Sequence, residues 1–169
     1  QPSRQQCDID SLITECLEGI NNVRIPKNIK VTRKSSQSTL LANGDRDLLR
    51  QVFPNLINNA IQAMPNGGEL KLNAQKSSLS NRDMTIDSEA RQYISVTISD
   101  NGVGMSADSL AKIFNPFFTT KDKGTGLGLA ISHNIIKAHQ GTIDAMSEEG
   151  KGTSFTVKIP SWDEDFDEK

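Results

Sequence analysis

Hydrophobic residues recur along this chain with the two periods that distinguish helices from strands. Apolar side chains spaced i, i+3, i+4 and i+7 predict an amphipathic helix over 9–20, with Asp8 or Asp10 as its cap. The same spacing predicts a long helix over 45–64, which the Pro and Gly residues of 65–68 end. The apolar residues of this second helix form one face, which we expect to be buried.

Strict alternation of apolar and polar residues, which is typical of strands, occurs in further segments of the chain: 28–34, 69–75, 93–99, 142–147 and 153–159. Helical spacing predicts a short helix over 106–113, capped by Ser106, and a longer helix over 126–139. The polar segment 76–91 is expected to form a long mobile hairpin, and 114–123 has no period and is expected to be a loop.

The order of these elements predicts an α/β (α+β) two-layer sandwich. We expect one mixed β-sheet of about five strands, with about three helices packed on one of its faces. The 169 residues are one domain's worth of chain and long enough to bury a sizeable core. We expect this domain to span 1–160 and an acidic C-terminal tail to follow over 161–169.

Composition and charge argue against several classes of function. The net charge of -2 and the lack of a Lys/Arg cluster argue against binding to nucleic acid. No apolar run approaches the roughly 18 residues of a membrane span, and the first residues do not resemble a signal peptide. The two cysteines form no CxxC pair, which fits a reducing compartment. We therefore expect a cytoplasmic segment that makes no membrane contact.

The polar face of the long predicted helix carries amides where a solvated helix carries charges. Its amide residues, which we call the amide stripe, are Gln51, Asn55, Asn58, Asn59 and Gln62. Each Asn costs about 0.5 kcal/mol of helix propensity. The amide stripe therefore indicates a ligand, because carbonyl oxygens bind hard cations and NH₂ groups donate to phosphate. The alternative is that these side chains bond a neighbouring backbone.

Two glycine-rich turns offer complementary halves of a nucleotide site. At the end of the predicted strand 93–99, Asp100 can accept a hydrogen bond from an exocyclic amine, which adenine has and guanine lacks at that edge. Gly102 and Gly104 would let a flat ring approach the backbone. Asp-x-Gly is also an ordinary turn, so this motif carries weight only beside the others.

The second turn, Gly124-x-Gly126-x-Gly128, opens a predicted helix whose free N–H groups and dipole favour phosphate. Its spacing is neither the G-x-G-x-x-G of dinucleotide folds nor a P-loop. The loop before it is expected to be a lid, with aromatic anchors and lysines that meet phosphate charge: Phe114, Phe117, Phe118, Lys121 and Lys123. Core phenylalanines and surface lysines are the alternative. Together the three segments predict ATP with a divalent cation.

Five short motifs resemble, in order, the boxes of the catalytic and ATP-binding domain of two-component sensor histidine kinases, which has the Bergerat (GHKL) fold. The motifs are Asn55-Leu-Ile-Asn-Asn59-Ala, Asp100-x-Gly102-x-Gly104, Phe114-x-Pro116-Phe117-Phe118, Gly124-Thr-Gly126-Leu-Gly128-Leu and Gly150-x-Gly152-Thr153. The chain is most similar to the nitrogen-regulation type of sensor kinase. The resemblance also fits the cytoplasmic part of a membrane-anchored sensor.

The resemblance implies ATP and Mg²⁺ as cofactors, with Asn59 ligating the metal and Asp100 binding the adenine N6 amine. It also implies that Thr153 assists at N6 through water. The residues expected to act in catalysis are Asn55, Asn59, Lys121 and Lys123. The residues expected to contact the nucleotide are Asn55, Asn59, Gln62, Asp100, Gly102, Gly104, Phe114, Phe117, Thr125, Gly126, Leu127, Gly128, Leu129 and Thr153.

Asn55 distinguishes the kinases from other members of the superfamily. The ATPase clamps of the gyrase, Hsp90 and mismatch-repair types carry a Glu there as general base, and Asn cannot act as a base. A neutral imidazole needs none, so the resemblance implies a protein-histidine kinase. Gln62 stands where many sensor kinases have a Lys, and Pro54 is expected to bend its helix.

Neither His133 nor His139 has the flanking residues of a phosphoacceptor histidine. The acceptor is therefore expected on a dimerisation domain of the same full-length protein, with the receiver domain of a response regulator as the next partner. Two alternatives remain open. A pseudokinase module would bind ATP or ADP without transferring phosphate, and an ATPase clamp would hydrolyse ATP alone and dimerise on binding it.

Overall fold

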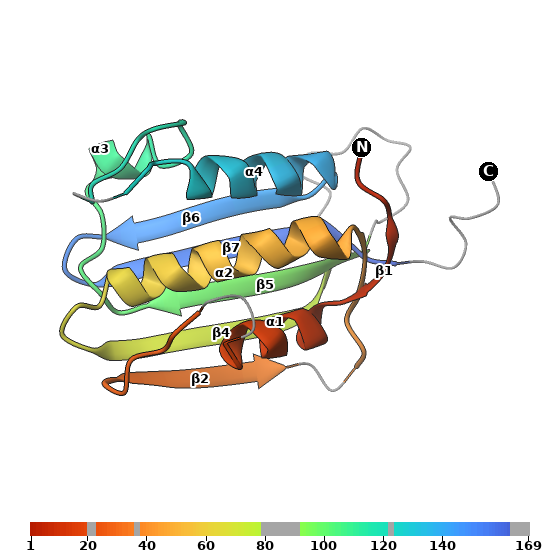
Figure 1. Ribbon diagram of the computed structural model, residues 1–169, viewed down its shortest axis with the longest axis horizontal. Helices are drawn as coiled ribbons and strands as arrows, with labels where there is room; N and C mark the ends of the chain where they lie inside the picture. Colours follow the sequence, from red (N-terminus) through yellow and green to blue (C-terminus); the bar gives the residue numbers. More distant parts are fainter. Residues whose placement is uncertain (20–22, 36–37, 79–91, 122–123, 163–169) are drawn as a thin grey trace.

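A mixed five-stranded sheet forms one layer of the protein (Figure 1). The strands lie across the sheet in the order β2 (Ile29–Ser35), β4 (Gly68–Ser78), β5 (Gln92–Asp100), β7 (Gly152–Pro160) and β6 (Thr142–Glu148). β2 pairs with β4 in parallel, and the other neighbours pair antiparallel. The computed structural model describes residues 1–19, 23–35, 38–78, 92–121 and 124–162. The mixed sheet predicted from the sequence is confirmed.

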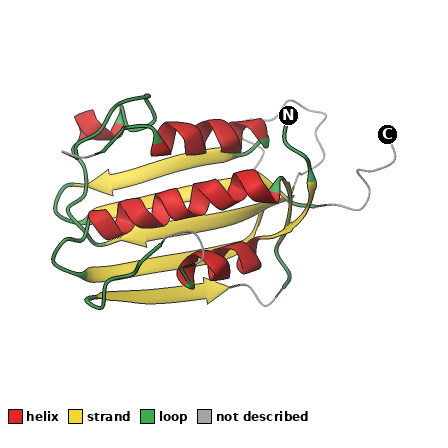
Figure 2. Ribbon diagram, viewed as in Figure 1, coloured by secondary structure: helices red, strands yellow, loops and turns green. Residues whose placement is uncertain are grey.

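Three helices cover one face of this sheet as a second layer (Figure 2). They are α1 (Ile9–Leu17), α2 (Arg46–Gln62) and α4 (Gly128–Ala138). Inward-facing strand residues such as Val96 and Val157 are buried with Phe53 of α2 in a single core. The short helix α3 (Ala107–Leu110) lies beside β6. The predicted two-layer sandwich is therefore confirmed.

Local signals determine where the helices begin. The Asp8 carboxylate accepts from the Ser11 N–H at 3.1 Å, so Asp8 and not Asp10 caps α1. Asp45 caps α2 by accepting from two N–H groups of its first turn, at 3.1 and 3.2 Å. α2 continues through the buried Pro54, so the missing N–H of this residue does not end the helix.

A second, two-stranded sheet was not predicted from the sequence. β1 (Gln5–Asp8) and β3 (Leu41–Gly44) pair antiparallel. Each has only four residues, which is too few to show an alternating pattern. Ser161 pairs with β3, and the Trp162 N–H donates to the Leu41 carbonyl at 2.9 Å. The chain therefore stays bound to the domain through Trp162.

Several element ends differ from the sequence prediction. α1 ends at Leu17, because Gly19 then adopts a positive φ of 81°. α4 begins at Gly128 and not at 126, and α3 has four residues within the predicted range 106–113. β4 continues to Ser78, into the segment predicted as a hairpin. The rest of that segment, Lys123 of the lid and most of the predicted tail lie outside the described residues: 79–91, 122–123 and 163–169.

α2 and α4 run antiparallel, side by side (Figure 1), and are joined near both ends of α4. His139 is fully buried, and its Nε2 accepts from the Asp45 N–H at 2.9 Å while its Nδ1 donates to the Ile135 carbonyl at 2.7 Å. Because an N–H only donates and a carbonyl only accepts, these partners determine the neutral tautomer. At the other end, Asn55 Nδ2 donates to the Gly128 carbonyl at 3.3 Å. The middle of α2 and the start of α4 are thereby held together.

Candidate nucleotide-binding site

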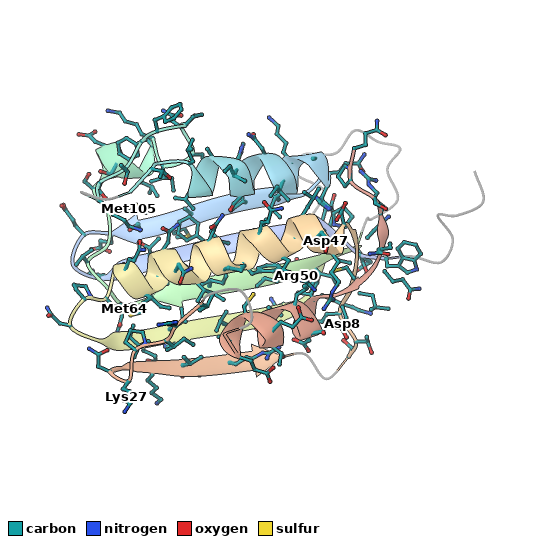
Figure 3. The ribbon with its side chains drawn as sticks, viewed as in Figure 1. Asp8, Lys27, Asp47, Arg50, Met64 and Met105 are labelled. Carbon is teal, nitrogen blue, oxygen red and sulfur yellow. The ribbon has the colours of Figure 1, made fainter. Side chains whose placement is uncertain are left out.

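A cavity of about 500 Å³ opens where α2 ends and α4 begins. Its walls come from the C-terminal half of α2, the end of β5, the start of β7 and the segment between α3 and α4. Met105 lines the cavity and Met64 follows α2, and Figure 3 labels both at this end of the molecule. The three segments predicted to form a nucleotide site therefore meet in one cavity.

Asp100, the last residue of β5, provides a carboxylate at one end of the cavity. Its Oδ1 accepts from the Gly102 N–H at 2.9 Å and from the Thr153 N–H at 3.3 Å. Burial raises the pKa of this carboxyl, and the two backbone N–H groups partly oppose the rise. Because both bonds go to Oδ1, Oδ2 is the oxygen that can accept from a ligand.

Apolar side chains line the cavity beside Asp100: Val103, Met105, Ile113, Leu129 and Phe155. Only Leu129 was expected here from the sequence. The hydrophobic periodicity of the sequence predicts that Ile113 and Phe155 are core residues, and it does not indicate that they also face a ligand. An apolar slot beside a carboxylate suits a flat heterocycle that carries an exocyclic amine.

The amide stripe and the lid meet at the other end of the cavity. Lys121 Nζ donates to Asn59 Oδ1 at 2.8 Å and also to Gln62 Oε1. Partial desolvation of the ammonium lowers the pKa of Lys121, although the residue as a whole is exposed. A lid lysine therefore brings positive charge to Gln62 at this end of the cavity.

Asn55 lines the cavity but directs its NH₂ group towards α4. Its Nδ2 donates to the Gly128 carbonyl and to Ser132 Oγ, both at 3.3 Å, and Ser132 is fully buried. These bonds tie α2 to the start of α4. Asn55 thus holds the two helices together, and no carboxylate stands at this position to deprotonate a ligand.

Most of the residues predicted to contact a nucleotide line the cavity: Asn55, Asn59, Gln62, Asp100, Gly104, Thr125, Gly126, Gly128, Leu129 and Thr153. Lys121, which was expected to act in catalysis, lines it too. Asn58 of the amide stripe lines it as well. Gln51 lies instead at a shallow hollow between α2 and α4. The amide stripe therefore faces the cavity along its C-terminal part only.

Four predicted contact residues do not line this cavity. Gly102 packs against the end of α2, where a Cβ would lie 2.1 Å from a carbonyl oxygen. Phe114 stacks on His133, with ring centroids 5.1 Å apart, and the Phe117 side chain is 76% exposed. Leu127 lines the adjoining shallow hollow. The absence of a side chain at Gly102 thus serves packing between α2 and the turn that follows β5.

The two ends of the lid are joined to each other. The Phe117 N–H donates to the Gly126 carbonyl at 3.0 Å, and both residues have a positive φ, of 66° and 71°. A Cβ on Gly126 would lie 2.3 Å from the Phe117 carbonyl carbon, so only glycine allows this approach. The lid therefore leaves the body of the domain and returns to it at one point.

The amide oxygens at the end of the cavity that the amide stripe lines fit a magnesium ion that arrives with a nucleotide. No group of three or more His, Cys, Asp or Glu side chains gathers as a metal site within the described ranges. Asn59 Oδ1 already engages a cation, the Lys121 ammonium. Mg²⁺ commonly takes one or two protein oxygens and completes its shell with phosphate and water. One amide oxygen beside a phosphate site satisfies that requirement.

Comparisons with known proteins agree with this geometry. The profile of one family, described as "Histidine kinase-, DNA gyrase B-, and HSP90-like ATPase", matches residues 44–163. Sensor histidine kinase ZraS of Escherichia coli (strain K12) is 36% identical over 156 residues, which are 92% of this chain and 31% of ZraS. Sporulation kinase E of Bacillus subtilis (strain 168) is 43% identical over 112 residues, 66% of this chain and 14% of that protein.

Solved structures show the same likeness. The catalytic domain of histidine kinase ThkA, free of nucleotide, has a TM-score of 0.74 and 30% identity, over 94% of this chain and 96% of that one. Full-length ShkA in complex with AMPPNP has a TM-score of 0.74 and 26% identity, over 95% of this chain and 31% of that one.

The chain belongs to the family of histidine kinase-, DNA gyrase B- and HSP90-like ATPases. Within this family it is a catalytic domain of the sensor histidine kinase type, and nucleotide binding follows from that membership. The chain spans 31% of the length of ZraS, so the relatives of full length carry further segments. In the part of the chain that the structure describes, no helix is both long and apolar enough to cross a lipid bilayer.

Proposed function

We propose that this domain binds Mg²⁺-ATP and transfers the γ-phosphate to a histidine on a separate dimerisation domain. The adenine would occupy the apolar slot with its N6 amine on Asp100. The phosphates would run past the N-terminus of α4, whose free N–H groups and dipole favour negative charge. Phosphoryl transfer of this kind depends mainly on positioning and charge stabilisation.

The orientation of Asn55 carries the proposal. One helical turn before Asn59, an ATPase needs a base that activates water, and Asn55 instead donates to the Gly128 carbonyl and to Ser132 Oγ. The site therefore has no base at the position where clamps of this superfamily have one. A neutral imidazole already carries the lone pair that attacks phosphorus, so a histidine acceptor suits a site without a base.

Asn59 and Lys121 would have different roles at the phosphates. Asn59 Oδ1 would hold Mg²⁺, which neutralises phosphate charge when it is bound. The Lys121 ammonium would leave Asn59 and bond an oxygen of the terminal phosphate, because a charged phosphate oxygen is a stronger acceptor for an ammonium than a neutral amide oxygen. The phosphohistidine would then pass its phosphoryl group to an Asp on a response regulator receiver domain.

Transfer from γ-labelled ATP with Mg²⁺ to a separately expressed dimerisation domain of the same full-length protein tests this function. The expected label on the acceptor is acid-labile and base-stable, as a phosphohistidine is. Asn59→Ala should abolish labelling. Asn134→Ala, on the exposed side of α4, is the matched control that should retain it. Tight ATP binding without transfer to the acceptor would favour the pseudokinase alternative, and ATP hydrolysis without an acceptor would favour the clamp.

A further inference from the structure

The wall of the cavity beside Asp100 includes a hydroxyl whose orientation is determined from outside the cavity. Thr153, the second residue of β7, lines the cavity and is only 7% exposed. Its partner across the β6–β7 pair is Ser147, and the two hydroxyl oxygens lie 2.8 Å apart. Ser147 does not line the cavity itself, so it can act on a ligand only through the lining residues that it bonds, of which Thr153 carries the hydroxyl.

The hydrogen bonds of Ser147 determine which of the two hydroxyls donates. The Met105 N–H donates to Ser147 Oγ at 2.8 Å, and an N–H cannot do otherwise. Ser147 Oγ lies 3.1 Å from the Gly152 carbonyl, which can only accept, so the single hydroxyl proton of Ser147 is used there. The Thr153 hydroxyl must therefore donate its own proton to Ser147 Oγ.

We propose that Ser147 is a positioning residue for base specificity, because it turns the Thr153 hydroxyl into a pure acceptor. This inference rests on the proposed function, that the cavity binds ATP. With its proton directed to Ser147, Thr153 Oγ1 presents only lone pairs to the cavity. Asp100 Oδ2 is the neighbouring acceptor, since Oδ1 already takes two backbone N–H groups. The side chains of Asp100 and Thr153 thus offer two acceptors and no donor to the cavity.

Two acceptors select an amine and reject a carbonyl at the same position of the base. The exocyclic amine of adenine has two N–H groups, so it can donate one directly to Asp100 and one directly to Thr153. A hypoxanthine or guanine base carries an oxygen there, which would face both acceptors with no proton between them. Discrimination of this kind is strong because the buried polar groups of the site are left unpaired by the wrong ligand.

Removing the Ser147 hydroxyl should relax this discrimination. In Ser147→Ala the Thr153 proton loses its acceptor, so the hydroxyl can rotate and donate into the cavity. ITP is the appropriate probe, since it differs from ATP in carrying the carbonyl in place of the amine. We expect the ratio of the Kd for ITP to the Kd for ATP to fall about tenfold in the variant, the value of one net hydrogen bond.

Three further variants make the test specific. Ser154 lies next to Thr153 but does not line the cavity, and its Oγ lies 2.7 Å from Ser99 Oγ. Ser154→Ala should therefore keep the wild-type ratio. Ser147→Thr restores a hydroxyl and should restore the ratio. Thr153→Val removes the hydroxyl on which Ser147 acts. In that background, Ser147→Ala should produce no further change in the ratio.

The competing results are distinct. An unchanged ratio in Ser147→Ala, with near-ultraviolet circular dichroism showing a folded domain, would overturn the role of Ser147 while leaving ATP binding intact. An additive loss in the double variant with Thr153→Val would overturn it too, because Ser147 would then act independently of Thr153. Failure of the wild-type domain to bind ATP would overturn the proposed function, and this inference with it.

Discussion

Lys121 and Asn59 are 62 positions apart in the chain, yet Lys121 Nζ lies 2.8 Å from Asn59 Oδ1. The ammonium therefore occupies the amide oxygen that we propose for Mg²⁺. Two cations cannot share that oxygen at bonding distance without strong repulsion, so binding of a metal–nucleotide complex must displace Lys121. The displaced side chain remains next to the position of the terminal phosphate, and this exchange leads to the first prediction.

Lys121→Met should weaken the binding of ATP more than that of ADP. Removal of the charge-assisted bond to the terminal phosphate should cost ATP about three- to tenfold in Kd, since the residue is exposed and its charge is screened. ADP lacks that phosphate and gains from an unoccupied Asn59. Isothermal titration calorimetry of both nucleotides with Mg²⁺ measures the two values.

Lys137→Met in the last turn of α4 is the control for the loss of a lysine charge, because Lys137 is exposed and does not line the cavity. It should leave both Kd values within about twofold of wild type. Equal losses for ATP and ADP in Lys121→Met would show that the lysine contributes no bond to the terminal phosphate.

Metal removal should show that Asn59, rather than another amide side chain, holds Mg²⁺. We expect EDTA to weaken ATP binding by the wild-type domain at least about tenfold, which corresponds to about 1.4 kcal/mol. Asn59→Ala should bind ATP weakly both with and without Mg²⁺. The exposed Asn134 again provides the matched control, in Asn134→Ala. Retention of the full Mg²⁺ effect in Asn59→Ala would assign the metal to a different oxygen.

Asp100→Asn should stabilise the fold and weaken nucleotide binding. Burial raises the pKa of Asp100 in the folded protein above its unfolded value, so between the two pKa values the folded state binds more protons. The free energy of unfolding therefore decreases as pH rises through this window, and the variant lacks that decrease. Urea denaturation should show the variant as the more stable protein at neutral pH, with the difference shrinking as the pH falls towards the ordinary pKa of 3.8 and absent below it.

The same substitution should raise the Kd for ATP about tenfold or more, because a bond from the adenine amine to a charged acceptor contributes about 1.5–3 kcal/mol. Equal stability of both proteins across the pH range would mean that burial does not strain the ionised carboxylate. Unchanged ATP affinity would place the base elsewhere in the cavity.

His139→Ala should lower the free energy of unfolding by about 3 kcal/mol, through a cavity and an unpaired Asp45 N–H. Urea denaturation at neutral pH measures the change. His133 provides the comparison, because it is only partly buried and makes one ring contact, with Phe114. His133→Ala should cost about 1 kcal/mol. Similar losses in both variants would mean that the bond to Asp45 contributes little.

The sequence predicts the main body of the fold because its elements have single, strong periods. The long helix over 45–64 and the alternating strands at 93–99 and 153–159 have one apolar face each, which specifies a helix layer on a sheet. The amide stripe could be recognised for a related reason. A helix face without charges is rarely solvated, and the structure has Asn58, Asn59 and Gln62 facing the cavity.

Features that depend on pairing between distant residues could not be predicted in the same way. β1 and β3 are too short for a pattern and exist because they pair with each other. The role of Ser147 depends on its register opposite Thr153 and on the Met105 N–H, neither of which a local pattern reveals. Gly102 was assigned to the ligand, whereas steric contact with the end of α2 is what requires glycine there.

The bond between the Phe117 N–H and the Gly126 carbonyl has a consequence for how this domain can change over evolution. Because the lid begins and ends at one point, a longer or shorter lid leaves the start of α4 and the amide stripe in place. Closing a loop twice as long costs only about 0.6 kcal/mol more. Natural variation or grafting can therefore replace the residues between Phe117 and Gly126 as one unit, without moving the start of α4.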